Sequence, residues 1–122
     1  MAFQPTISRS SEVEQFIDQF LSAVCDASRR HILEYLSSFP EEDTSPHECS
    51  VGEIAEHQGL AISTTSEHLK QLLQMNLLLA RRDGKKTYYR VRNHKLVQAF
   101  HDLIGSLETD YDRRLLPPVE EE

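Results

Sequence analysis

A glycine between two short helical patterns restricts the fold of this chain more than any other feature. The stretch VGEIAEHQGLAISTTSEHLKQLLQMN has helical periodicity before and after Gly59, where a helix is expected to stop. The positions that share an inward face are Val51, Ile54 and Ala55 before the glycine, and Thr65, Leu69, Leu72 and Leu73 after it. Two short helices joined by a tight turn with a glycine form a helix-turn-helix, so the sequence predicts this motif.

The residues that follow predict a β-hairpin. LLLARRDGKKTYYRV contains two β-favourable runs joined through Asp83-Gly84, and a glycine at such a turn readily adopts a positive φ. A hairpin behind a helix-turn-helix is the wing of a winged helix. Because side chains alternate along a strand, we expect one of Tyr88 and Tyr89 to pack on the helices and the other to lie on the open face.

Amphipathic helices on both sides of this unit complete a mainly α domain. The first follows the cap candidates Ser10 and Ser11, the second follows the N-cap candidate Asp26 and ends near Ser37, and residues 37–50 form a polar loop. The apolar stripe of the first helix is Val13, Phe16, Ile17, Phe20, Leu21 and Val24, and that of the last is Leu96, Val97, Phe100, Leu103, Ile104, Leu107 and Tyr111. In the second helix, Ile32, Leu33, Tyr35 and Leu36 are expected to point inward.

The chain length of 122 residues fits one domain. We expect an N-terminal arm over 1–10, a winged helix-turn-helix domain over 11–115 and an acidic tail over 116–122. The N- and C-terminal helices carry more apolar surface than one small domain covers, which predicts a homodimer through these helices. No stretch approaches the roughly 18 consecutive apolar residues of a membrane span, and no signal peptide is evident, so we expect a cytoplasmic protein with no membrane partner.

The positive charge of the chain is concentrated in one segment. The formal net charge is −7, but residues 70–95 hold eight Lys or Arg against one acid, Asp83, for a local charge of +7. Lysines also protect edge strands from pairing with other chains, so charge alone does not identify a partner. Duplex DNA carries a phosphate charge about every 1.7 Å, and an acidic protein binds it when its cations lie on the contacting face.

The segments DASRRHIL, VGEIAEHQGLAISTTSEHLKQLLQMNLL and ARRDGKKTYYRV follow one another in an order that resembles the ArsR/SmtB family of bacterial winged-helix repressors. The resemblance covers roughly residues 13–110. The matching positions are Asp26, Ser28, Arg29, Ile32 and Leu33 in the first segment, Ser63, Thr64, Ser66, His68, Leu69 and Lys70 in the second, and Arg82, Asp83, Gly84, Lys85, Tyr88 and Tyr89 in the third.

The resemblance implies a recognition helix and a basic wing that contact double-stranded DNA. The expected major-groove residues are Ser63, Thr64, Ser66, Lys70 and Gln71, and the expected wing contacts to the backbone or minor groove are Arg81, Arg82, Lys85 and Lys86. Glu67 departs from the family pattern: it either accepts a hydrogen bond from a cytosine amino group or, as we favour, caps the helix start with Thr64 in a Thr-x-x-Glu box. His68 is expected to be half-buried and hydrogen-bonded rather than a base reader or a metal ligand.

The family's usual metal sites are degenerate in this chain. Ser50 and Gly52 stand where relatives have a Cys-Val-Cys pair, and a second site on the last helix would fall on Arg92, His94, Gly105 and Glu108, so half of its ligands are missing. Weak alternative clusters are His47, Glu48 and Cys49 in the loop, and His94, His101 and Glu108 at seven-residue spacing. Metal geometry is demanding, so we predict no metal or other cofactor. Cys25 and Cys49 are expected to be thiols, with a redox pair as the less favoured interpretation.

These features together predict a sequence-specific, dimeric transcriptional regulator of ArsR type that represses by binding operator DNA, with an effector that the sequence does not identify. The alternative is a winged-helix protein-interaction module whose basic wing contacts an acidic partner. No Gly-rich phosphate loop, nucleophile motif or pair of catalytic carboxylates stands out, which argues against an enzyme.

Overall fold

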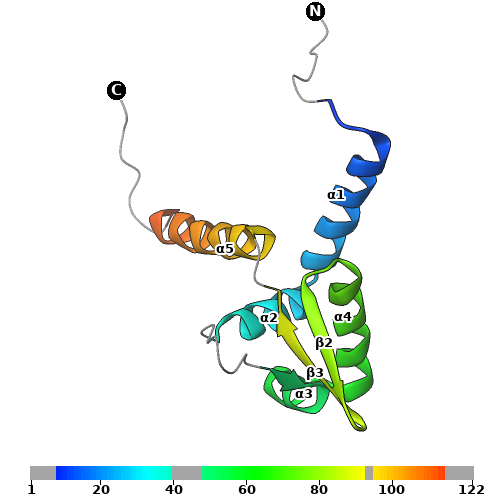
Figure 1. Ribbon diagram of the computed structural model, residues 1–122. Helices are drawn as coiled ribbons and strands as arrows, with labels where there is room; N and C mark the ends of the chain where they lie inside the picture. Colours follow the sequence, from blue (N-terminus) through cyan, green and yellow to red (C-terminus); the bar gives the residue numbers. More distant parts are fainter. Residues whose placement is uncertain (1–7, 40–47, 93–94, 115–122) are drawn as a thin grey trace, which may run out of the picture.

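The computed structural model describes residues 8–39, 48–92 and 95–114. Its elements in chain order are α1 (Ser11–Val24), α2 (Ala27–Ser37), β1 (Cys49–Ser50), α3 (Val51–Gln58), α4 (Ile62–Gln74), β2 (Leu78–Asp83), β3 (Lys86–Val91) and α5 (Lys95–Arg114). Helices α2, α3 and α4 and the sheet form one body, from which α1 and α5 project in different directions (Figure 1). The predicted mainly α winged helix-turn-helix is confirmed.

The first two helices begin at the predicted capping residues. The Ser10 hydroxyl accepts a hydrogen bond from the Val13 N–H at 3.2 Å, and the Asp26 carboxylate accepts one from the Arg29 N–H at 3.0 Å. Each cap satisfies a backbone donor that a helix start leaves without an intrahelical partner. Helix α2 ends at Ser37, as expected.

The helix-turn-helix is formed by α3, the turn at Gly59 and α4. Gly59 has φ of 66°, a left-handed conformation that ends α3 where the sequence predicted. Helix α3 begins with a capping box that we did not predict, in which Ser50 and Glu53 each accept a hydrogen bond from the other's backbone N–H. Hydrogen bonding to the Glu53 carboxylate from the Ser50 backbone N–H, and secondarily from the Ser50 side chain, lowers the pKa of this carboxyl, because it stabilises the charged form.

The sheet has one strand more than the predicted hairpin. Its order is β1-β3-β2 with antiparallel pairing throughout, and β1 places Cys49 opposite Tyr89 and Ser50 opposite Tyr88. We expected a polar loop here, and that prediction is wrong for Cys49 and Ser50. A two-residue strand has no alternation to detect, and it forms because β3 offers a free edge beside the start of α3.

The core lies between the helices and the inner face of the sheet. The side chains without solvent exposure include Ile32 and Leu33 of α2, Ile54 of α3, Leu69 and Leu72 of α4, and Leu77. Tyr89 packs against this core, whereas Tyr88 lies under the Arg81 guanidinium, 5.1 Å from ring centroid to carbon, so the two tyrosines take different environments as expected. Residues 1–7 of the predicted arm over 1–10, and the whole tail over 116–122, lie outside the described residues.

The two glycines Gly59 and Gly105 should respond in opposite ways to alanine. Gly59→Ala forces a Cβ into a left-handed conformation and should lower the free energy of unfolding by about 1–2 kcal/mol. Gly105→Ala, inside α5 with no atom of another group within 4 Å of the added carbon, should raise it by about 0.5–1 kcal/mol. Urea unfolding of both variants at one protein concentration checks this, and two changes of the same sign would contradict it.

Candidate nucleic-acid interface

Helix α4 buries one face and leaves the other open. Thr65, Leu69 and Leu72 are its buried residues. The exposed residues are Ile62, Ser63, Thr64, Ser66, Glu67, Lys70, Gln71 and Gln74. All five side chains that we expected in the major groove therefore lie on the open part of this helix, with short hydroxyl groups in its first two turns and longer polar groups farther along.

The start of α4 differs from the predicted capping box. The helix begins at Ile62 with Ala61 as N-cap, and no side chain caps it. Thr64 is thus the third helical residue, too far along to accept at the N-cap position, so the Thr64–Glu67 cap is wrong. The Thr65 hydroxyl donates to the Ala61 carbonyl at 2.9 Å. The Glu67 carboxylate is exposed on the polar face of α4.

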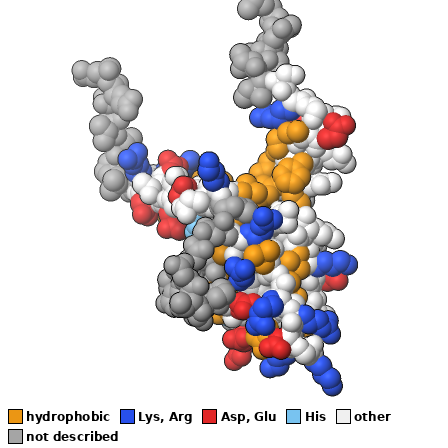
Figure 2. Space-filling model, in the orientation of Figure 1, with side chains coloured by type: hydrophobic (Ala, Val, Ile, Leu, Met, Phe, Trp, Pro, Cys, Tyr) orange, Lys and Arg blue, Asp and Glu red, His pale blue; other side chains and the backbone are white. Residues whose placement is uncertain are grey.

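The tip of the wing carries cations that point into solvent. Arg82, Lys85 and Lys86 are exposed around the turn at Gly84, whose φ is 63°. Lys and Arg side chains gather at this end of the molecule in the space-filling view (Figure 2). Arg82 donates from Nε to the Gly84 carbonyl at 3.3 Å, which holds its side chain along the turn.

Arg81 is paired with two carboxylates of the protein. Its Nε lies 3.0 Å from both carboxylate oxygens of Glu48, and its Nη1 lies 3.8 Å from Asp83. The Glu48 side chain is only 15% exposed, and the Arg81 guanidinium also covers the Tyr88 ring. Arg81 therefore fastens β1 to the wing, a role that sequence reasoning missed because Glu48 is 33 positions away.

The Arg29 side chain, on α2, contacts both α1 and the recognition helix α4. Its Nε donates to the Ala23 carbonyl at 2.6 Å and its Nη2 to the Ser22 carbonyl at 3.3 Å, both at the end of α1. Its Nη1 lies 3.4 Å from Nδ1 of His68 on α4. Arg29 thus connects the end of α1 and the start of α2 to the middle of α4.

His68 fits its expected role in this junction. Its side chain is 16% exposed, and its Nδ1 lies near both the Arg29 guanidinium and, at 4.0 Å, the Asp26 carboxylate. The Arg29 backbone N–H, together with the nearby charges of Arg29 and His68, lowers the pKa of the Asp26 carboxyl.

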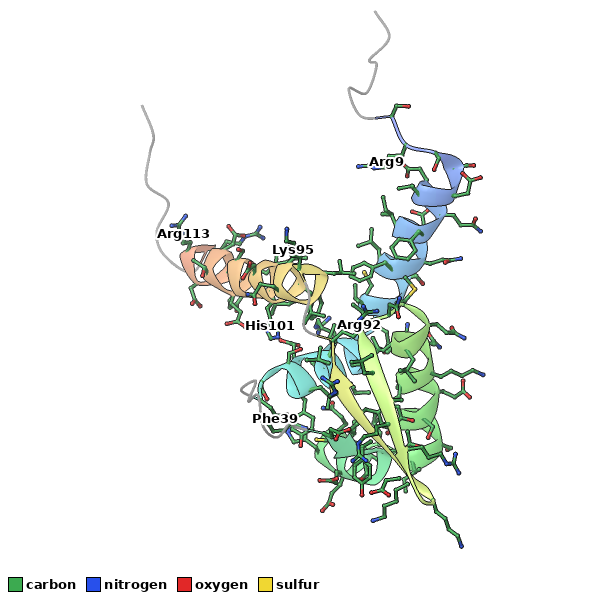
Figure 3. The ribbon with its side chains drawn as sticks, in the orientation of Figure 1. Arg9, Phe39, Arg92, Lys95, His101 and Arg113 are labelled. Atoms are coloured by element: carbon green, nitrogen blue, oxygen red, sulfur yellow. The ribbon has the colours of Figure 1, made fainter. Side chains whose placement is uncertain are left out.

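The candidate metal residues do not come together in the described part of the chain. Ser50 caps α3, Glu48 turns to Arg81, and Cys49 is buried, where desolvation raises the pKa of its thiol. His101 projects from α5 on the side that faces α2 (Figure 3), whereas Glu108 is fully on the surface. No three His, Cys, Asp or Glu residues within 8–39, 48–92 and 95–114 could hold one ion, and His47 and His94 lie outside these ranges.

The two cysteines are free thiols in different environments. Cys25 is exposed at the end of α1, and Cys49 is buried beside the Tyr35 hydroxyl. The less favoured redox pair would need one accessible sulfur and one buried sulfur to meet. No disulfide links Cys25 and Cys49 in this structure.

An apolar groove separates α1 from α5. It has a volume of about 350 Å³ and is lined by Phe20, Leu21 and Val24 of α1 and by Leu96, Phe100, Leu103, Ile104 and Leu107 of α5. Apolar side chains are visible along α1 beside this opening (Figure 2). Phe16 is 52% exposed and Tyr111 is 62% exposed, so the apolar surface extends beyond the groove along both helices. In the part of the chain that the structure covers, no helix has the length and apolar content to cross a membrane.

Comparison with known proteins gives consistent relatives. A family model described as bacterial regulatory protein, arsR family, matches residues 26–78. The nodulation protein NolR of Rhizobium meliloti is 32% identical over 110 residues, which cover 88% of this chain and 83% of that protein. The crystal structure of NolR from Sinorhizobium fredii aligns with a TM-score of 0.65 at 30% identity, over 89% of this chain and 97% of that chain.

A second solved structure shares the fold at lower identity. It is a homodimeric winged helix-turn-helix DNA-binding domain, Mb0332 from Mycobacterium bovis, described as a possible ArsR-family regulator. It aligns over all of both chains with a TM-score of 0.64 and 24% identity.

The neighbouring arginines Arg29 and Arg30 should differ in their effect on stability. Arg29→Gln removes the donors to the Ser22 and Ala23 carbonyls, and Ala23 is buried, so the free energy of unfolding should fall by about 1–3 kcal/mol. Arg30→Gln loses a 3.9 Å ion pair with Glu34 between two partly exposed side chains and should cost below about 0.5 kcal/mol. Chemical unfolding at equal concentration measures both, and equal losses would show that the junction is not special.

Proposed function

This chain belongs to the ArsR family of bacterial regulatory proteins and has the winged-helix DNA-binding fold, and from this premise we propose that it is a homodimeric repressor of transcription that reads a two-fold symmetric operator. Helix α4 enters the major groove through Ser63, Thr64, Ser66, Lys70 and Gln71. The wing tip contacts the DNA backbone or minor groove through Arg82, Lys85 and Lys86. Arg81 contributes less to this contact, because it is paired with Glu48 and Asp83. As a binder of operator DNA, the protein acts in the cytoplasm.

The observation that carries this proposal is the open face of α4 next to a basic wing. Hydroxyl and amide side chains such as Ser63, Thr64 and Gln71 hydrogen-bond to base edges and phosphates, and the nearby Lys70 supplies positive charge. An acidic protein partner would be satisfied by the wing cations alone and gives no reason for a short-hydroxyl surface on α4. The DNA-binding proposal therefore accounts for more of the exposed surface than the protein-interaction alternative.

Dimerisation through α1 and α5 is supported by the apolar surface of both helices. Phe16 and Leu21 on α1, and Leu103, Leu107 and Tyr111 on α5, are exposed large apolar residues. Monomeric proteins rarely expose contiguous apolar surface of this kind, and a two-fold interface between identical helices would cover it. The Mycobacterium bovis domain, which has the same fold, is named as a homodimer, and this supports a dimeric state.

The dimer proposal predicts a concentration-independent mass of two chains in the micromolar range. Leu103→Lys should weaken dimerisation at least about tenfold, because it places an unpaired ammonium group in an apolar interface. Thr109→Lys, on the opposite face of α5, adds the same charge and should leave the mass unchanged. Sedimentation equilibrium of the full chain measures all three, and a wild-type monomer would exclude a two-fold operator.

The DNA proposal predicts separate effects of wing and recognition-helix variants. The preferred duplex should have half-sites about 10–10.5 bp apart, or a multiple of that spacing. Arg82→Ala and Lys85→Ala should weaken binding to all duplexes alike and each reduce the slope of log K against log salt by about one. Arg81→Ala should reduce this slope less, because Glu48 and Asp83 already neutralise its guanidinium.

Variants of Ser63 and Gln71 should instead change which bases are preferred. The measurement is selection of bound duplexes from a random pool, followed by fluorescence anisotropy at several salt concentrations. Wing and helix variants that behave identically, or a wild type that prefers no duplex, would favour the protein-interaction alternative.

A further inference from the structure

Ile62 is an exposed apolar side chain at the first position of the recognition helix. Its side chain is 57% exposed. Among the described residues, the other large apolar side chains that are exposed lie on α1 and α5, or at Leu79 on β2. Ile62 is therefore separate from the surface that we assign to dimerisation and is surrounded by the polar residues Ser63, Thr64 and Ser66 of α4.

The stability of α4 does not explain an isoleucine at this place. Ala61 provides no side-chain cap, and Ile62 is absent from the buried core and from the residues packed against it. A β-branched residue has a lower helix propensity than alanine or the long unbranched residues. In the free protein, Ile62 thus adds apolar surface without contributing a cap or a core contact.

The position of Ile62 gives it access to base edges if α4 enters the major groove. The N-terminal residues of a recognition helix are those that contact the bases, and Ile62 is followed directly by the exposed Ser63 and Thr64. An isoleucine side chain has no donor or acceptor, so it cannot read the hydrogen-bonding groups of any base. The one apolar group that the four base pairs present in the major groove is the C5-methyl group of thymine.

We propose that Ile62 is a specificity-determining residue that selects thymine at one position of each half-site by contact with the C5-methyl group. The inference rests on the proposed DNA-binding function and adds a reader of methyl groups to a surface otherwise composed of hydrogen-bonding and charged side chains. The nearby Glu67 carboxylate, exposed on the same helix, does not compete for this role because it accepts hydrogen bonds and cannot recognise a methyl group.

The test uses the duplex selected by the full-length protein and removes one methyl group at a time. Deoxyuridine keeps every hydrogen-bonding group of thymidine and lacks only the methyl. Replacing the thymine read by Ile62 in both half-sites should weaken wild-type binding about fourfold for each half-site, the effect of about one buried methyl or methylene group. At the same position, 5-methylcytosine should bind better than cytosine, because it restores the methyl on a different base.

Variants assign the effect to Ile62. Ile62→Ala should bind thymine and uracil duplexes within about twofold of each other at that position, since its short side chain leaves the methyl in water. Ile62→Val should retain part of the discrimination, and Leu79→Ala, which truncates another exposed apolar residue, should retain all of it. The position is exposed and alanine favours a helix, so the thermal unfolding midpoint of Ile62→Ala should be no lower than that of the wild type.

The outcomes separate this proposal from the function on which it rests. A wild type that prefers a duplex but shows no thymine whose uracil effect is lost in Ile62→Ala would overturn the role of Ile62 and leave the DNA-binding function standing. A wild type that prefers no duplex would overturn both. Weaker binding of Ile62→Ala to all duplexes alike, with an unchanged uracil effect, would assign Ile62 to positioning of α4 and would also overturn methyl recognition.

Discussion

One guanidinium group links the recognition helix to the two helices that precede the helix-turn-helix. Arg29 donates to two carbonyl groups at the end of α1 and approaches His68 in the middle of α4, while its own backbone N–H is held by Asp26. An arginine can make these contacts together because its donors point in several fixed directions, which a lysine cannot reproduce. Since α1 also carries the apolar surface that we assign to dimerisation, this junction connects the partner-facing helix to the DNA-facing helix. In a two-fold dimer, it would help to set the separation of the two copies of α4.

The cations of the wing have two roles: Arg81 connects parts of the protein, and the others are open to contact with DNA. Arg81 is exposed but paired with Glu48 and Asp83, and Arg82, Lys85 and Lys86 lie exposed around the turn. A cation that is already paired releases fewer counterions on binding a phosphate, so proximity to the wing tip alone does not define a DNA contact. The Arg81–Glu48 pair also holds β1 against β3, and β1 leads directly into the capping box of α3. The wing and the first helix of the helix-turn-helix are therefore fixed to each other by this contact.

The sequence predicts the features that depend on local periodicity and local caps. The helices, the stop at Gly59, the turn at Gly84, and the caps at Ser10 and Asp26 all follow from residues within about one helical turn of each other. Contacts between distant segments were not predictable in this way: β1 is too short to show a pattern, and Glu48 finds Arg81 only through the fold. The Thr64–Glu67 cap was wrong for a third reason. A capping box depends on where the helix starts, and the turn at Gly59 places that start at Ile62, two residues before Thr64.

We assign the exposed apolar surface of this molecule to two different partners, according to its extent: a second protein chain at α1 and α5, and DNA at Ile62. Along α1 and α5 it is continuous and includes a groove of about 350 Å³, which suits a second protein chain. At Ile62 the apolar surface is one side chain next to Ser63 and Thr64. This area is too small for a protein interface but is large enough to cover one methyl group. The free energy of such a contact comes from removing apolar surface from water and involves no counterion release, unlike the phosphate contacts of the wing. Rising salt should therefore weaken total binding through Arg82, Lys85 and Lys86 while leaving the discrimination by Ile62 nearly unchanged, so that the two parts of the interface control affinity and specificity separately.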